Sequence, residues 1–247
     1  MRSRDELERQ GNWLFRRRSH LPLIMLPVLL VAVRETNWLE RFAGETLKDS
    51  WDIFCLAISL IGLAIRLITI GHAPAGTSGR NTKNQKATVL NTTGMYSIIR
   101  HPLYLGNFII ILGLILLVSI WWFALIAILA FWLYYERIIA AEEKFLEEKF
   151  GNQYLDWAEK TPAILPRFHD WQPPSLPFSI RNALKREYSG FFLIIACFAL
   201  LDIGEDAFCG KWESNWGSLV LFIVGLIAYL TLRALKKNTT ILDVEGR

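Results

Sequence analysis

Cysteine is scarce in this chain of 247 residues, which contains only three. Cys55, Cys197 and Cys209 lie far apart, with no CxxC pair and no histidine at the spacing that zinc sites use. A disulfide framework and a structural zinc site are therefore not expected, and we predict that the protein holds no metal.

Charge is missing from one long stretch of the chain. Leu103 to Tyr135 are 33 consecutive residues without Asp, Glu, Lys or Arg. A soluble helix that is apolar on every side for that length would have no core large enough to bury it. Four shorter uncharged runs occupy Ser19–Val33, Ile53–Ile65, Ser189–Leu201 and Asn215–Leu232. These runs exclude an ordinary soluble globule and predict a polytopic membrane protein.

Positive charge is distributed unevenly between the loops that join these runs. With a cytoplasmic N-terminus and a 33-residue run that turns back on itself, 22 of the 27 Lys and Arg residues lie inside and four outside. This asymmetry follows the positive-inside rule. The isoelectric point near 9.0 therefore reports topology, and no nucleic-acid partner is expected. We predict a multi-pass membrane protein with both termini in the cytoplasm, in the inner membrane if the cell is bacterial.

The uncharged run 103–135 is too long for a single crossing, because a bilayer core of about 30 Å takes about 20 helical residues. We expect a short helical hairpin that turns near Ser119–Trp122, where two tryptophans suit a membrane interface. The charged segment 136–158 has a helical period and is predicted to form a cytosolic helix.

The whole chain is expected to be an all-α bundle with about six spans. Two spans, at 20–37 and 52–71, precede the hairpin, and two follow a proline-rich stretch. We divide the chain into an N-terminal segment with the first span (1–50), a membrane core (51–168) and a C-terminal extension with two further spans (169–247).

The entrance to the hairpin carries the densest set of polar side chains. Pro102 suits the first turn of a helix, where its missing N–H has no partner in any case. His101 and Tyr104, three residues apart, should then face the same way, with Arg100 just outside the helix start. Gly106 would let a ligand or another backbone come close.

Two charged clusters, forty residues apart in sequence, should converge at the mouth of the hairpin. The fold-back places Arg100 and His101 within a turn or two of Glu142 and Glu143. Carboxylates accept hydrogen bonds from a ribose diol, a guanidinium or imidazole receives a carboxylate, and tyrosines can border a sulfonium cation. The mouth thus has partners for a zwitterionic nucleoside cofactor.

Two motifs carry a resemblance to a known family. The segment Gly-x-Tyr-x-x-x-Arg-His-Pro-x-Tyr-x-Gly at 94–106 and the segment Glu-Glu-x-x-Leu-x-x-x-Phe-Gly-x-x-Tyr at 142–154 resemble the isoprenylcysteine carboxyl methyltransferase and phospholipid methyltransferase superfamily. The resemblance covers about 50–168 and implies a membrane enzyme that uses S-adenosylmethionine and takes a lipidic acceptor from the bilayer. It implies that the cofactor is held by Tyr96, His101, Tyr104, Gly106, Glu142 and Glu143.

The acceptor site is less well defined. The resemblance makes Arg100 and Arg167 candidates for orienting an anionic acceptor. Arg66, inside a predicted span, either extends its charge to the nearby interface or faces the same anionic group. The chain departs from the isoprenylcysteine type because about eighty residues follow Pro166. The polar loop 76–81 is either a lid or acceptor contact at the site, or a flexible connector.

Methyl transfer is an in-line displacement, so a carboxylate or phosphate oxygen mainly needs orientation and desolvation. An amine would first have to lose a proton, to Glu143 or His101. We predict methylation of a carboxylate or phosphate oxygen on a membrane-embedded, lipid-like acceptor, because the arginines would repel an ammonium group.

Two other functions remain open from the sequence. The Arg-His-Pro-x-Tyr theme also resembles membrane sterol reductases that use NADPH, although these have an Arg-Asp pair where this chain has Glu142 and Glu143. A non-enzymatic transporter or scaffold is the other alternative, with Arg66, Arg100 and the glutamates along an ion path. The charged residues cluster at one membrane face, which favours an enzyme over a conduit.

Overall fold

The computed structural model describes residues 2–17, 24–33, 44–77, 87–209 and 216–246, and within them the secondary structure is entirely helical. The elements in chain order are α1 (Arg2–Arg17), α2 (Leu26–Val33), α4 (Glu45–Gly71), α5 (Met95–Ile98), α6 (Pro102–Leu117), α7 (Trp121–Phe150), α8 (Asn152–Lys160), the short 3₁₀ helix η2 (Phe168–Asp170), α9 (Ile180–Cys209) and α10 (Trp216–Asn238). Four helices, α4, α7, α9 and α10, are long and apolar enough to span a membrane, and α6 is a shorter apolar helix. The predicted all-α membrane bundle is confirmed.

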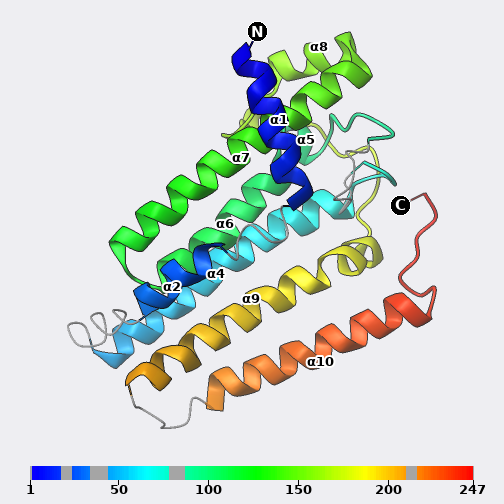
Figure 1. Cartoon of the computed structure of the whole chain (residues 1–247). Helices are drawn as coiled ribbons and strands as arrows, with labels where there is room; N and C mark the ends of the chain where they lie inside the picture. Colours follow the sequence, from blue (N-terminus) through cyan, green and yellow to red (C-terminus); the bar gives the residue numbers. More distant parts are fainter. Residues whose placement is uncertain (1, 18–23, 34–43, 78–86, 210–215, 247) are drawn as a thin grey trace.

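The long helices run alongside one another in the bundle (Figure 1). α4 packs most extensively on α6 and also contacts α9, while α10 packs on α9. The N-terminal helix α1 lies against α7, and α8 lies at the same end of the bundle as α5 (Figure 1). The first predicted span, 20–37, falls within the described residues only from 24 to 33. Most of the predicted lid or connector, 78–81, lies outside them.

The predicted hairpin is present, and its turn lies where the sequence places it. α6 ends at Leu117 and α7 begins at Trp121. Ser119 between them has a positive φ of 58°, which reverses the chain within three residues. The second half of the hairpin differs from expectation, because α7 continues without a break through 136 to Phe150. The helix ends instead at Gly151, whose φ of 54° suits glycine.

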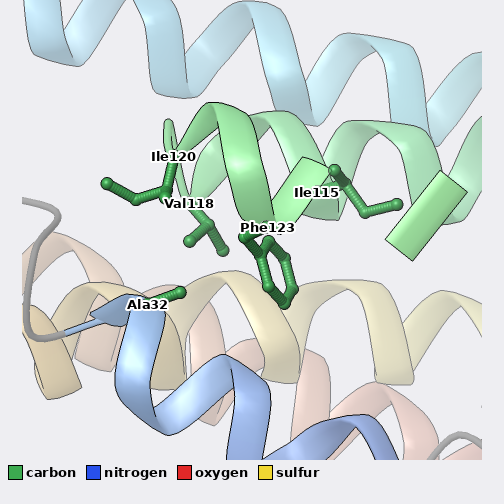
Figure 2. Close-up of a cluster of buried hydrophobic side chains, with 5 residues drawn as sticks. All are labelled: Ala32, Ile115, Val118, Ile120 and Phe123. Carbon is green, nitrogen blue, oxygen red and sulfur yellow. The ribbon is translucent and has the colours of Figure 1, made fainter. Parts of the chain in front are cut away.

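The turn of the hairpin is held by a buried apolar cluster. Figure 2 shows Ile115, Val118, Ile120 and Phe123 gathered around the turn, with Ala32 of α2 beside them. All five are at most 7% exposed. This packing closes the far end of the hairpin, so the two helices open toward the end of the bundle that carries the polar residues.

Small residues let α4 and α6 approach closely. A Cβ atom on Gly62 would lie 2.6 Å from the carbonyl oxygen of Gly106, and one on Gly106 would lie 2.5 Å from Cγ of Arg66. Ser59 donates a hydrogen bond across the same contact to the carbonyl of Ile110, at 2.9 Å. Packing of this kind between small residues is what drives helix association in a bilayer. It fixes α6, and therefore the mouth of the hairpin, against α4.

The C-terminal extension joins the core at the C-terminal end of α4. Ser179 donates its backbone N–H to the carbonyl of Gly71 at 2.9 Å, and the Asn182 amide donates to the carbonyl of Ile70 at 2.8 Å. These bonds satisfy carbonyls at the end of α4 that have no partner within the helix. α9 therefore starts where α4 ends and packs along it. The division of the chain into three domains stays a prediction.

Candidate active site

The first side of the site is built by the start of α6. His101 is the residue that precedes the helix and Pro102 is its first residue, as the sequence predicts. Gly94, with φ of 61°, begins the short helix α5 just before it. These local constraints place the side chains of Arg100 and His101 at the mouth of the hairpin.

The proline-rich segment after α8 holds this part of the chain in place. Arg100 donates its backbone N–H to the carbonyl of Pro162, and Arg167 donates its own to the carbonyl of Ile98, both at 2.9 Å. The Trp157 indole donates to the carbonyl of Tyr96 at 3.1 Å. The first motif is therefore held against the segment 157–167, which follows the second motif in the chain.

Four side chains form what we call the mouth cluster: Arg100, His101, Glu142 and Glu143. Arg100 Nη1 forms an ion pair with Oε1 of Glu143 at 3.0 Å, and His101 Nε2 is hydrogen-bonded to the same oxygen at 3.1 Å. Nδ1 of His101 lies 3.7 Å from Oε2 of Glu142. The His101 side chain is 6% exposed, whereas the two carboxylates are 27% and 33% exposed. The predicted convergence of the two clusters is confirmed, with a buried imidazole below partly accessible carboxylates.

An aromatic wall continues inward from the mouth cluster. The Tyr104 ring stacks on His101 with 5.6 Å between centroids, and the edge of Tyr135 packs against Tyr104 at 5.0 Å. Phe131 in turn stacks on Tyr135 at 4.1 Å. We call Tyr104 and Tyr135 the aromatic wall, because their π faces and edges border the polar mouth on the membrane side.

Two buried polar atoms at this place have no hydrogen-bond partner among the described residues. They are Nε of Arg100 and the hydroxyl of Tyr154, whose residue is 3% exposed. Burial, and the nearby Glu143, raise the pKa of Tyr154 to about 12 against the opposing effect of the Arg100 guanidinium beside it, so its hydroxyl keeps its proton and remains a donor. Buried donors of this kind are rare and call for a partner.

The remaining predicted site residues lie around or below the mouth cluster. Tyr96 lies on α5, where burial and the charge of Glu142 raise its pKa. Arg167 is half exposed and reaches Asp170 at 3.6 Å and the Lys160 carbonyl at 3.4 Å. Gly106 faces α4, where Gly62 and Arg66 leave no room for a side chain. Its contact with the cofactor stays a prediction, and close helix packing already accounts for glycine there.

Arg66 does not join the mouth cluster. Its Nε and Nη2 donate to the two carboxylate oxygens of Glu187 on α9, at 2.8 and 2.7 Å. Its Nη1 donates to Oδ1 of Asn107 at 2.5 Å. Asn107 in turn donates from Nδ2 to the Tyr135 hydroxyl at 2.9 Å. Binding of the acceptor by Arg66, one of its two predicted roles, would therefore have to displace partners that already balance its charge.

Sequence reasoning missed three of these residues. Tyr154 was part of the second motif but received no role. Asn107 is an amide within an otherwise apolar run, and Glu187 is an acid next to a predicted span; both positions are signals for an intramembrane partner of Arg66.

In the described residues, no group of three or more His, Cys, Asp or Glu side chains is arranged to hold a metal ion.

Comparison with known proteins identifies the family. Residues 53–153 match the family model for phospholipid methyltransferases. The chain is 32% identical to the nickel-cobalt-cadmium resistance protein NccN of Alcaligenes xylosoxydans over 203 residues, 81% of this chain and 89% of the relative. It is 34% identical to the cobalt-zinc-cadmium resistance protein CzcN of Cupriavidus metallidurans over 50% of this chain and 56% of that protein.

The same chain is similar to eukaryotic methyltransferases. It is 30% identical to protein-S-isoprenylcysteine O-methyltransferase B of Arabidopsis thaliana over 153 residues, 60% of this chain and 74% of the relative. No solved structure matches the chain. The matched region contains the first motif, the hairpin and all of the second motif except its last residue, Tyr154. The chain therefore belongs to the superfamily of membrane methyltransferases that includes the phospholipid and isoprenylcysteine carboxyl methyltransferases.

Proposed function

We propose that this protein transfers a methyl group from S-adenosylmethionine to a carboxylate or phosphate oxygen of a lipid-like acceptor in the membrane. The observation that carries the proposal is the convergence of Arg100 and His101 on Glu143 at 3.0 and 3.1 Å, at one end of a membrane hairpin. The family assignment supports methyl transfer, and the relatives named O-methyltransferases support an oxygen acceptor.

The residues at the mouth fit the cofactor that the family implies. The unpaired donors, Nε of Arg100 and the Tyr154 hydroxyl, suit the carboxylate of its amino-acid part. Glu142 and Glu143 would accept from its ribose hydroxyls, and the aromatic wall would border its sulfonium. When bound, S-adenosylmethionine supplies an electrophilic methyl group. By position, His101, Tyr96 and Gly106 remain further candidates for holding it.

The chain's own residues would then orient the acceptor and keep water out. A carboxylate or phosphate oxygen needs no general base, so the task of the site is alignment and desolvation. Arg167 on the rim has a half-exposed guanidinium and is the best candidate to receive the acceptor's anion. Arg100 is the second candidate. With the mouth at the inner face, both termini of the chain would be cytoplasmic.

Ligand binding is the first test. Calorimetry on the detergent-purified full chain should show micromolar binding of S-adenosylmethionine and S-adenosylhomocysteine, and this binding should disappear in Glu142→Ala. Binding of NADPH alone would move the protein to the sterol-type reductases. Binding of none of the three ligands would return weight to a transporter or scaffold.

The acceptor atom can be identified separately. Membranes that contain the protein are incubated with cofactor labelled in the methyl group, and the labelled lipid or peptide fraction is treated with base. A carboxyl methyl ester releases volatile labelled methanol, whereas a methylated amine keeps its label. Retention of all label by the organic fraction, together with an amine in the product, would overturn the oxygen assignment.

Metal resistance is a second role that the relatives suggest, because two of them bear that name and the first is aligned over 89% of its length. We propose that such a role would depend on the same methyl transfer. Growth of a strain lacking the gene on nickel, cobalt or cadmium, complemented with wild type or Glu142→Ala, tests this. Equal rescue by both would separate resistance from the mouth cluster.

A further inference from the structure

The intramembrane partner of Arg66 comes from outside the region that defines the family. Glu187 lies on α9, beyond the matched residues 53–153. Its side chain is 2% exposed and accepts two hydrogen bonds from one guanidinium, in the bidentate arrangement that gives such pairs their strength. An unpaired charge at this place would cost free energy, and in the α4–α9 contact the two opposite charges compensate each other.

The pair fixes the orientation of an amide on α6. Because Arg66 Nη1 donates to Oδ1 of Asn107, the amide nitrogen must face the other way. There it donates to the hydroxyl of Tyr135 on α7, at 2.9 Å. Side chains from four helices, α9, α4, α6 and α7, are thereby connected by charged or polar hydrogen bonds.

The connection ends at the methyl-transfer site. The hydroxyl of Tyr135 is held by Asn107, and its ring edge packs on Tyr104 at 5.0 Å. Tyr104 stacks on His101, which hydrogen-bonds Glu143 in the mouth cluster. The Tyr135 hydroxyl of the aromatic wall is therefore held by a hydrogen bond whose orientation depends on Arg66 and Glu187.

We propose that Glu187 is a positioning residue for the aromatic wall, acting through Arg66, Asn107 and Tyr135, and that the C-terminal extension thereby completes the site. The proposal rests on the proposed function of the mouth, since it assigns the wall to the sulfonium cation of the cofactor. It gives Arg66 a role different from binding the anionic acceptor, because its charge is balanced by Glu187.

The test compares two ligands that differ in charge at sulfur. An aromatic wall favours the S-adenosylmethionine cation over the neutral S-adenosylhomocysteine. In Glu187→Gln, calorimetry on the full chain should show the ratio of the two affinities reduced by about five-fold. This reduction corresponds to the loss of a typical cation–π interaction. General loosening of the fold would weaken both ligands equally and leave the ratio unchanged.

A matched control exists at the opposite end of the same two helices. Lys48 of α4 pairs with Asp202 of α9 at 3.7 Å, so Asp202→Asn removes an α4–α9 ion pair that has no connection to the wall. We expect it to keep the wild-type affinity ratio. An equal fall of the ratio in Asp202→Asn and Glu187→Gln would show that helix tethering alone explains the effect and would overturn the proposal.

A second variant keeps the proposal testable even where Glu187→Gln folds poorly. Asn107→Leu leaves the Arg66–Glu187 pair in place but removes both hydrogen bonds of the Asn107 amide, the one accepted from Arg66 and the one donated to Tyr135. It should reduce the affinity ratio as Glu187→Gln does, and the double variant should fall no further, since both changes interrupt one connection. A wild-type ratio in Asn107→Leu overturns the positioning role. Failure of the wild-type protein to bind either adenosyl ligand would instead refute the proposed function itself.

Discussion

The mouth cluster and the Arg66–Glu187 pair are built from the same kinds of side chain, yet their environments differ. In the mouth, the carboxylates are 27% and 33% exposed, and two buried donors nearby lack a partner among the described residues. Within the span, Glu187 is 2% exposed and both its oxygens are bound to Arg66 at 2.7 and 2.8 Å. The first arrangement retains capacity for a ligand, whereas the second is already satisfied. Composition alone therefore does not distinguish a binding site from a structural one; the unused hydrogen-bonding capacity does.

The largest expected effect is on stability at the intramembrane pair. Glu187→Ala leaves a buried guanidinium without its carboxylate and should cost about 3–5 kcal/mol, as broken buried pairs do. Replacing both residues, with Arg66→Met and Glu187→Leu, should recover most of that loss because no charge remains buried. Thermal unfolding in detergent measures both. A double variant as unstable as the single one would show that the loss comes from packing rather than from the unpaired charge.

The next effect is on ligand affinity at the mouth. Glu143→Ala removes the common acceptor of Arg100 and His101, and a lost hydrogen bond to a charged group is worth about 1.5–3 kcal/mol. The affinity for S-adenosylhomocysteine should fall about 10- to 100-fold, and thermal stability should fall modestly because the buried His101 loses its hydrogen-bond partner. Glu148→Ala, an exposed acid on the same helix, is the control. Similar losses of affinity in both variants would argue against a specific contact.

A smaller effect is expected at Tyr154. Tyr154→Phe removes a buried hydroxyl that has no hydrogen-bond partner in the described part of the chain. The midpoint temperature of thermal unfolding should therefore stay the same or rise slightly. The affinity for S-adenosylhomocysteine should nevertheless fall by about 1 kcal/mol, or roughly five-fold. Binding of 5′-methylthioadenosine, which lacks the carboxylate, should not change. If both ligands lose affinity equally, the hydroxyl does not contact the carboxylate.

The smallest effect is expected at the rim. Arg167→Ala removes a half-exposed guanidinium, and exposed charge interactions are worth at most about 1 kcal/mol. The KM for the anionic acceptor should rise a few-fold, while the dissociation constant of S-adenosylhomocysteine stays at its wild-type value. Weaker binding of the adenosyl ligand in this variant would place Arg167 with the cofactor instead.

Sequence reasoning was most successful where chain connectivity constrains the geometry. A 33-residue uncharged run has to turn near its middle, and that requirement alone brings Arg100 and His101 to Glu142 and Glu143. Pro102 marks the helix start for a local steric reason. These predictions needed no knowledge of which other helices are neighbours.

The parts that could not be predicted depend on packing between distant segments. Arg66 and Glu187 are 121 residues apart, and no hydrophobic pattern in the sequence predicts that α4 and α9 are adjacent. Gly106 could equally face a ligand or a helix, and only the position of Gly62 decides. The sequence predicts a separate helix from 136 because the residues change there from apolar to charged. That change marks the passage from lipid to water, and a single helix can make this passage without a break.

The length of the uninterrupted helix α7 relates the depth of the site to the thickness of the membrane. Its 30 residues span about 45 Å, which exceeds the hydrocarbon thickness of about 30 Å by half. Glu143 lies 22 residues after Trp121, a rise of about 33 Å, so with Trp121 at one interface the carboxylates stand level with the opposite one. For the proposed acceptor, the reactive oxygen should then lie at the depth of the lipid headgroups. Changing the length of its apolar tail should matter far less than inserting even a few atoms between tail and oxygen.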